Sequence, residues 1–137
     1  MRPMTSTLEG PARALVESQG YCVVATRRND GEIHTVVAWI DLDEQGRLLL
    51  NSVEGRDWLA NLRRVGSATV TVFDLQNPGE FVSIRARLGS TSHDDAVEVI
   101  NALSRKILGV DYPLLRDDEE RVAIRLEPAH IVYQKMG

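Results

Sequence analysis

Residues 48–64 read LLLNSVEGRDWLANLRR, and the rest of the chain can be placed around them. The stretch begins as an apolar strand over residues 48–50 and passes through a polar turn over residues 51–55. It continues as a short helix over residues 56–64, in which three apolar side chains recur at helical spacing: Trp58, Leu59 and Leu62. The first N–H groups of a helix lack partners and carry the positive end of its dipole, so such a turn favours a bound anion.

Arg56 stands at the entrance of this predicted helix. Its guanidinium can donate two parallel hydrogen bonds to a phosphate. Ser52, Gly55 and Arg56 therefore raise the hypothesis of a phosphate-bearing cofactor seated at the start of the helix. The alternative is a plain strand-to-helix connection with a solvated arginine. The pattern alone favours that alternative, because one arginine beside one glycine is common.

The composition is that of one globular domain covering residues 1–137, with 43% hydrophobic and 26% charged residues. No apolar run approaches the roughly 20 residues needed to span a bilayer. The first 20 residues lack the apolar stretch of a signal peptide, so a cytoplasmic protein is expected. Cys22 is alone, which excludes an intrachain disulfide. The net charge of −4 argues against nucleic acid as the main partner.

Apolar periodicity and turn signals predict a mainly β protein with flanking helices. Strands are expected over residues 21–26, 33–42 and 47–52, joined by Asn/Asp/Gly turns into an antiparallel meander, and then over 67–74, 81–90, 121–126 and 131–133. Pro128 is expected to separate the last two. Helices are expected over about 8–18, 56–64 and 93–108. Six or seven short strands with few helices between them indicate a small antiparallel barrel that covers about residues 21–133.

Three pieces of sequence, in this order and spacing, carry a family resemblance: NDGEIHTVVAW over residues 29–39, GR at 55–56 with NLRR at 61–64, and RVAIRLEPAHI over 121–131. With them, residues 8–133 resemble the split-barrel flavin and deazaflavin oxidoreductases related to pyridoxamine 5′-phosphate oxidase. The resemblance implies an antiparallel split β-barrel of the FMN-binding type. It also implies a homodimer that holds the cofactor in a groove between its two chains.

The resemblance also assigns site residues by position. It implies that four strand residues run beside the isoalloxazine-type ring: His34, Thr35, Val36 and Val37. Asn51 and Ser52 would face the ring edge or the ribityl chain, and Gly55, Arg56 and Asn61 would serve the phosphate. Trp58 stands where many relatives carry a lysine, so it cannot supply that second cation, although it can stack on a ring or pack beneath the site. Val65-Gly66 replaces the usual Asp-Pro.

Two cofactors compete under this resemblance. The short chain, the arginine block and the ending at residues 121–131 look more like the branch that uses the deazaflavin coenzyme F-420 than the FMN branch. The implied function is hydride transfer between coenzyme F-420 and a small organic substrate. The alternatives are an FMN-dependent oxidoreductase and a non-catalytic split-barrel protein that binds a flavin or haem-type ligand.

Catalytic side chains are few on this interpretation, because the cofactor carries the chemistry. His34, near the expected ring, is the one candidate for donating a hydrogen bond or a proton, and a structural histidine is at least as compatible with its place on a strand. The three histidines are too scattered to predict a metal site. Trp39, Tyr21 and Tyr133 are interpreted as core or dimer-interface residues.

Overall fold

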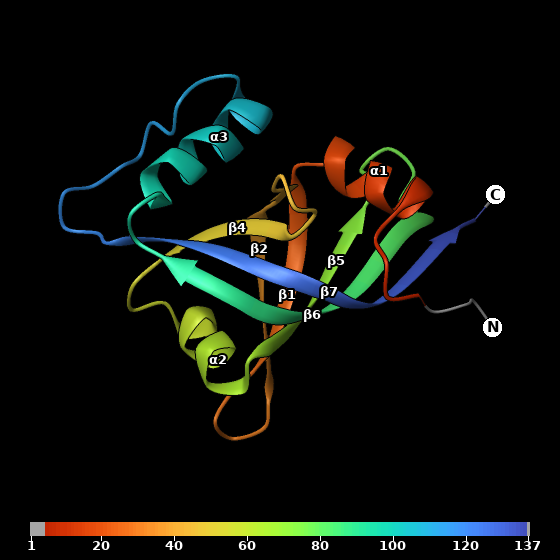
Figure 1. The fold of residues 1–137 in the computed structure, drawn as a ribbon, viewed down its shortest axis with the longest axis horizontal. Helices are drawn as coiled ribbons and strands as arrows, with labels where there is room; N and C mark the ends of the chain where they lie inside the picture. The colour runs from red at the N-terminus through yellow and green to blue at the C-terminus, as the bar shows by residue number, and fades with distance from the viewer. Residues whose placement is uncertain (1–4, 137) are drawn as a thin grey trace.

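A computed structural model describes residues 5–136 and shows one curled antiparallel sheet with three flanking helices (Figure 1). The elements follow the order α1 (Gly10–Ser18), β1 (Tyr21–Arg27), β2 (Ile33–Trp39), β3 (Asp41–Leu42), β4 (Leu48–Val53), α2 (Asp57–Val65), β5 (Ser67–Phe73), β6 (Glu80–Ser92), α3 (Ala96–Leu108) and β7 (Arg121–Lys135). The sheet order is β2-β1-β5-β6-β7-β4-β3. The mainly β architecture expected from the sequence is confirmed, with seven strands in the described part of the chain.

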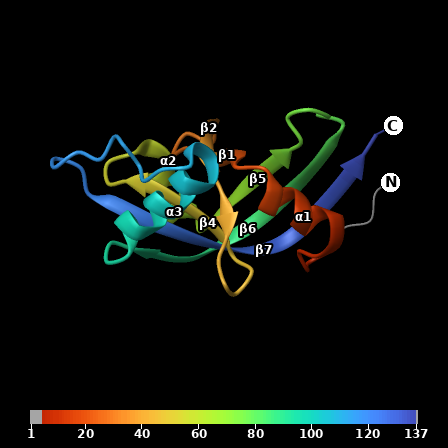
Figure 2. The ribbon, with the colours of Figure 1, turned by 90° about the horizontal axis from the view of Figure 1, so that it is seen from above.

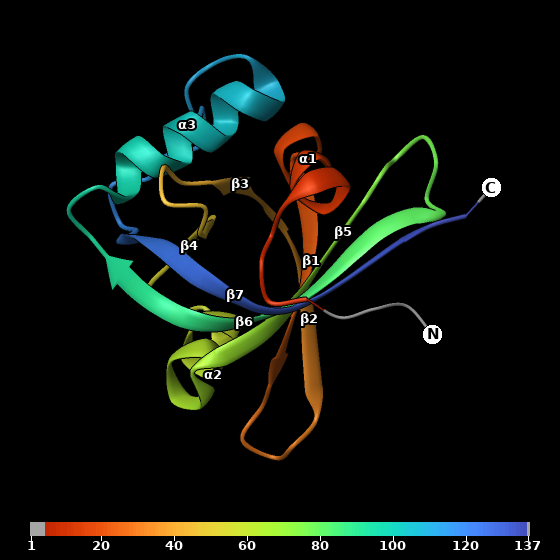
Figure 3. The ribbon, with the colours of Figure 1, turned by 45° about the vertical axis from the view of Figure 1, so that its right-hand side comes forward.

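The strand predicted over residues 33–42 is divided at Ile40, and this is a correction to the sequence interpretation. β2 pairs with β1, whereas β3 pairs with β4 at the opposite edge of the sheet. Ile40 lies between them with a fully buried side chain, and its N–H donates to the carbonyl of Gly20 at 3.0 Å. The expected three-stranded meander is therefore two hairpins at opposite edges. Because consecutive residues reach both edges, the sheet has to curl into a half-barrel (Figure 3).

Pro128 does not end the last strand, which is a second correction. β7 runs unbroken from Arg121 to Lys135 beside β6. The register passes from the pair Arg85 and His130 to the pair Ala86 and Pro128, so Ala129 is left over as a bulge. A bulge interrupts the ladder of hydrogen bonds, and a proline there costs little because no N–H is required of it.

The core fills the inside of the curl, where the buried faces of the strands meet α1 and α2. Figure 2 shows β7 curving across the width of the molecule, with α2 and α3 on one side of it. A second, smaller cluster packs α3 on β4 and β7 through Ala96, Val99, Leu103 and Ala123. All three expected helices are present, and each starts one to three residues later than predicted. None of the helices in residues 5–136 is long and apolar enough to cross a membrane.

The C-terminal end of α3 is fastened to the bend at Ile40. The ammonium group of Lys106 donates to the carbonyls of Ile40 (3.1 Å) and Val16 (3.3 Å), and it pairs with the Asp41 carboxylate at 3.1 Å. Gly20 approaches the same helix so closely that an added Cβ would lie 2.5 Å from Cγ1 of Ile107. These contacts fix α3 relative to β2.

We predict that Gly20→Ala lowers the free energy of unfolding by about 1–3 kcal/mol, the usual cost of overpacking. Urea unfolding of the single variants and of Gly20→Ala combined with Ile107→Ala measures the coupling. The double variant should lose less than the sum of the two single losses, because removing the Ile107 side chain relieves the clash. Strictly additive losses would contradict this account of the contact.

Candidate functional site

Two adjoining clefts lie where β2 faces β4 and the start of α2. The inner cleft has a volume of about 260 Å³ and is lined by Val37, Ala38, Trp39, Asn51, Ser52, Val53, Arg56, Trp58, Ile100, Leu103, Tyr112 and Arg121. The outer cleft has a volume of about 450 Å³ and is lined by His34, Val36, Val37, Gly55, Arg56, Asp57 and Trp58. Val37, Arg56 and Trp58 belong to both linings, so the two clefts meet at the entrance of α2.

The connection from β4 to α2 presents an arginine without a partner. Gly55 has φ +96°, a left-handed conformation that favours glycine, and Arg56 follows as the residue that caps α2. The backbone N–H of Arg56 donates to Val53, but its exposed guanidinium has no hydrogen bond or ion pair within residues 5–136. Asp57 adds one carboxylate to the outer cleft, where it offsets part of this positive charge.

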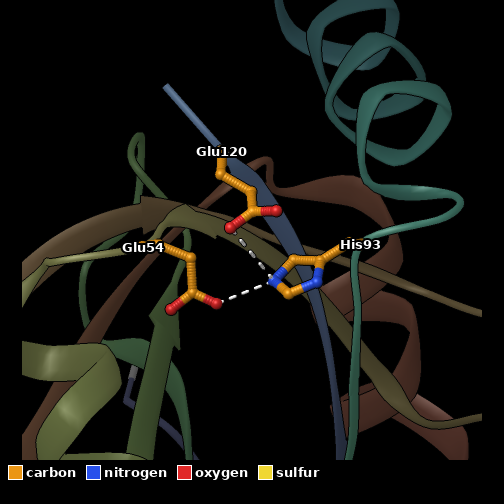
Figure 4. A group of neighbouring side chains, drawn as sticks. All are labelled: Glu54, His93 and Glu120. Carbon is orange, nitrogen blue, oxygen red and sulfur yellow. Dashed lines mark hydrogen bonds and ion pairs between the residues drawn. The ribbon is translucent and has the colours of Figure 1, made fainter. Parts of the chain in front are cut away.

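Glu54 anchors the same connection from behind. Both of its carboxylate oxygens accept from Arg63 of α2, at 2.6 and 3.0 Å, and Nε2 of His93 lies 2.7 Å from Oε2 (Figure 4). The backbone N–H of Glu54 donates to the carbonyl of Glu120 at 2.9 Å. The side chain of Glu120 is a longer contact, 3.9 Å from the His93 ring. The group is an ion-pair cluster that holds the loop before Arg56 between α2 and β7.

This cluster lowers the pKa of Glu54 from 4.5 to about 2, chiefly through the hydrogen bonds from Arg63 and then through His93. A lowered pKa means that the folded state favours the carboxylate. The resulting stabilisation is complete above the unfolded-state pKa and disappears as the pH falls through the folded-state pKa.

We therefore predict that Glu54→Gln is less stable than the wild type near neutral pH and that this difference shrinks between pH 4.5 and about 2. Urea unfolding at a series of pH values measures the difference in free energy of unfolding. Glu44→Gln, at an exposed glutamate in the turn between β3 and β4, is the control and should show no such trend. A wild-type-to-variant difference that stays constant down to pH 2 would refute the assignment.

The inner cleft is rich in hydrogen-bond donors that have no acceptor. Ser52 and Trp58 are 5% and 7% exposed as residues, and the Ser52 hydroxyl and the Trp58 indole N–H make no hydrogen bond in the described part of the chain. The lining holds two arginines and no carboxylate. Of the donors in this lining, Nε of Arg121 is a buried atom without a partner in residues 5–136, and buried polar groups are nearly always paired, which favours a ligand with acceptor atoms.

Eight of the ten residues expected at the site line the two clefts: His34, Val36, Val37, Asn51, Ser52, Gly55, Arg56 and Trp58. His34 is half-buried in the outer cleft, and its ring makes no hydrogen bond or ion pair within residues 5–136. Thr35 points to the exposed side of β2. Asn61 is buried and outside both linings: its amide donates to the Thr26 hydroxyl at 3.2 Å, which holds α2 against β1.

Tyr112 and Arg121 were not expected at the site, although both line the inner cleft. Arg121 lies beside Val53 in the β4–β7 ladder, and Tyr112 comes from the loop after α3. The backbone N–H of Tyr112 donates to the side chain of Asn101 at 2.8 Å, which folds this loop back over the helix. No local sequence signal marks a contact of this kind, because it joins residues that are distant in the chain.

The comparisons with known proteins fit this geometry. The model of the pyridoxamine 5′-phosphate oxidase family matches residues 8–135, so the chain belongs to this family, whose members are generally flavin-dependent oxidoreductases. A search of curated proteins finds no significant match.

Solved structures share the fold at low sequence identity. An F-420 reductase aligns with a TM-score of 0.80 and 21% identity over 90% of this chain and 97% of that one. A conserved hypothetical protein from Mycobacterium tuberculosis aligns with a TM-score of 0.69 and 16% identity, over 95% and 87% of the two chains. A Clostridium acetobutylicum protein of the pyridoxinephosphate oxidase family aligns with a TM-score of 0.66 and 19% identity, over 90% and 85%. The split-barrel fold is thereby confirmed.

Proposed function

We propose that this protein is an oxidoreductase that binds coenzyme F-420 in the two clefts and transfers a hydride between it and a small organic substrate. The observation that carries the proposal is the unpaired guanidinium of Arg56, placed beside Gly55 at the entrance of α2 where the two clefts meet. A phosphate there would accept from the guanidinium and from the first N–H groups of the helix. We also propose that the protein is cytoplasmic, as expected from the sequence.

The residues present suit a flavin-type cofactor. Arg56 is the phosphate anchor, and Trp58 replaces the lysine of many relatives with a neutral N–H donor and a flat ring. Ser52 supplies a further free donor, and the β2 residues Val36 and Val37 form an apolar edge along which a ring can lie. Asn61 acts indirectly, since its bond to Thr26 positions the helix that carries Trp58.

The bound cofactor would supply the hydride chemistry, as cofactors generally do. The chain orients it through donors on the turn and on β4, and the apolar side chains of α3 exclude water from the inner cleft. His34 lines the outer cleft, and its ring nitrogens have no hydrogen bond within residues 5–136, so it is the residue we propose to hold or deliver a proton. No nucleophilic side chain is needed for such a reaction.

The likeness to an F-420 reductase supports the deazaflavin over FMN, although that likeness concerns the fold. FMN also ends in a phosphate, so an FMN-dependent oxidoreductase, or a non-catalytic split-barrel protein that binds a flavin or haem-type ligand, would use the same anchor. Binding data for the two cofactors distinguish these alternatives.

We further propose that the protein is a homodimer in which a second copy covers the exposed face of the sheet. This face carries an apolar hollow of about 400 Å³ lined by Tyr21, Cys22, Val23, Val37, Phe73 and Leu75. Val37 is 72% and Leu75 57% exposed, which is unusual for large apolar side chains gathered at one place. Since Val37 also lines both clefts, a partner seated here would border the cofactor.

Arg56→Ala is predicted to weaken the binding of coenzyme F-420 by about 1.5–3 kcal/mol, roughly 10- to 150-fold in Kd, because a charge-assisted hydrogen bond to phosphate is lost. Fluorescence titration of the purified protein with coenzyme F-420 measures the two affinities. Arg116→Ala, at an exposed arginine that pairs with Asp118 in the loop after α3, is the control and should bind as the wild type does. An unchanged affinity for Arg56→Ala would remove Arg56 from the site.

Thr71→Arg is predicted to dissociate the homodimer, because Thr71 lies at the centre of the exposed face, paired with Val23 on one side and Ser83 on the other. Sedimentation should give twice 15.3 kDa for the wild type and 15.3 kDa for the variant. Ala102→Arg, on the exposed side of α3, should remain dimeric. A wild type that sediments as a monomer would disprove the homodimer.

A further inference from the structure

The inner cleft is lined by a second arginine, Arg121, besides the proposed phosphate anchor Arg56. Arg121, the first residue of β7, has a side chain that is only 12% exposed. Its Nε is buried and has no hydrogen-bond partner in the part of the chain that the structure describes. Since a buried charge that lacks hydrogen bonds is costly, this group calls for either a structural or a ligand-binding explanation.

The neighbours of Arg121 hold its side chain in place but leave most of its hydrogen-bond donors without an acceptor within residues 5–136. Its Nη1 donates to Oδ1 of Asn51 at 3.2 Å, and its Nη2 lies 3.5 Å from the Glu119 carboxylate. The guanidinium carbon sits 4.7 Å from the centre of the Tyr112 ring, which in turn meets the Trp39 ring edge-on at 5.8 Å. Within residues 5–136, one of its five N–H groups has a hydrogen bond, the one that donates to Asn51.

The two residues that contact the Arg121 guanidinium, Asn51 and Tyr112, are themselves held by hydrogen bonds. Asn51 donates its Nδ2 to the carbonyl of Ala96 at 2.8 Å, which turns its oxygen toward Arg121. The N–H of Tyr112 is tied to Asn101. A side chain held rigidly with donors left over is preorganised for an acceptor rather than free to turn into solvent.

The rest of the inner cleft agrees with a planar ligand that ends in an anion. The hydroxyl groups of Ser52 and Tyr112, both of which line the cleft, make no hydrogen bond within residues 5–136. Ile100 and Leu103 of α3 form an apolar wall, and Trp39 offers an aromatic face. No Asp or Glu is among the residues that line this cleft, and the Glu119 carboxylate, 3.5 Å from Nη2 of Arg121, lies outside the lining.

We propose that the part of the inner cleft at Arg121 and Tyr112 is a subsite for the carboxylate of a planar, conjugated substrate. A carboxylate would accept from the guanidinium, and its ring system would lie between Trp39 and the apolar wall of α3. The proposal rests on the proposed function, because it names the class of substrate that would meet the cofactor in these clefts. Arg56, which lines both clefts, serves the cofactor phosphate, and Arg121, which lines the inner cleft and not the outer one, serves the substrate.

The test is calorimetric titration of the whole protein with 2-naphthoate and with 2-naphthamide, which share a ring system but differ in charge. Each titration is made with and without saturating coenzyme F-420. We expect 2-naphthoate to bind roughly tenfold more tightly than 2-naphthamide, the effect of one charge-assisted contact. Equal binding of the two compounds, or no binding of either, would overturn the proposal.

Three variants locate the binding. Arg121→Gln should abolish the preference for the carboxylate, whereas Arg116→Gln, the matched exposed control, should keep it. Tyr112→Phe retains the ring that supports Arg121 and removes only the hydroxyl. It should lower the affinity for 2-naphthoate several-fold and leave 2-naphthamide unchanged, so it decides the matter if Arg121→Gln does not fold. A preference that survives in both variants would disprove the subsite.

Arg56→Ala separates this proposal from the proposed function. It should weaken coenzyme F-420 and leave the binding of 2-naphthoate by the cofactor-free protein intact. Naphthoate binding that depends on Arg121 in a protein that does not bind coenzyme F-420 would support the subsite and reject the cofactor. Binding of coenzyme F-420 without any preference for 2-naphthoate would support the proposed cofactor and reject the substrate subsite. Loss of naphthoate binding in Arg56→Ala would place the anion at Arg56 and overturn the proposal.

Discussion

The chain crosses from one edge of the sheet to the other at Ile40, and both clefts depend on this crossing. β2 and β3 are neighbours in sequence but occupy opposite edges, so the sheet must curl until β2 faces β4. The buried Ile40 side chain and its bond to Gly20 hold the bend, and Lys106 ties α3 to it. The walls of the inner cleft are therefore set by packing in the core and do not have to form when a ligand binds.

Arg56, Arg63 and Arg64 lie close together in the sequence but differ in the partners that they have in the fold. Arg63 is held by both oxygens of Glu54, and Arg64 donates to the side chain of Asn61 and the carbonyl of Arg27. Arg56, only a few residues earlier, has none of these contacts. Arg63 and Arg64 fix the position of α2, and Arg56, which has no partner within residues 5–136, is the one we propose for the anion. Glu54 pairs with Arg63 and also anchors the loop that carries Arg56, because its N–H donates to the carbonyl of Glu120.

Local signals in the sequence predict a large part of the fold. Asn/Asp/Gly turns and period-two alternation indicate the hairpins, and the spacing of Trp58, Leu59 and Leu62 indicates α2. The break at Ile40 has no such signal, because residues 38–42 read as uninterrupted strand. The continuation of β7 past Pro128 depends on a bulge that only its pairing with β6 reveals. Arg121 and Tyr112 escape prediction for a similar reason, since long-range packing brings them to the inner cleft. Asn61 could be placed on α2 from sequence, but the direction of its side chain depends on how α2 packs against β1.

The central claim is that the clefts at Arg56 hold coenzyme F-420, and the most direct measurement is a parallel fluorescence titration of the wild-type protein with coenzyme F-420 and with FMN. The account predicts saturable binding of coenzyme F-420 that is tighter than that of FMN, because we propose that the clefts at Arg56 hold the deazaflavin. Tighter binding of FMN would contradict the cofactor assignment and move the protein to the flavin branch. Absence of binding by either compound would contradict the anion site itself and show that Trp58 leaves Arg56 unable to hold a phosphate.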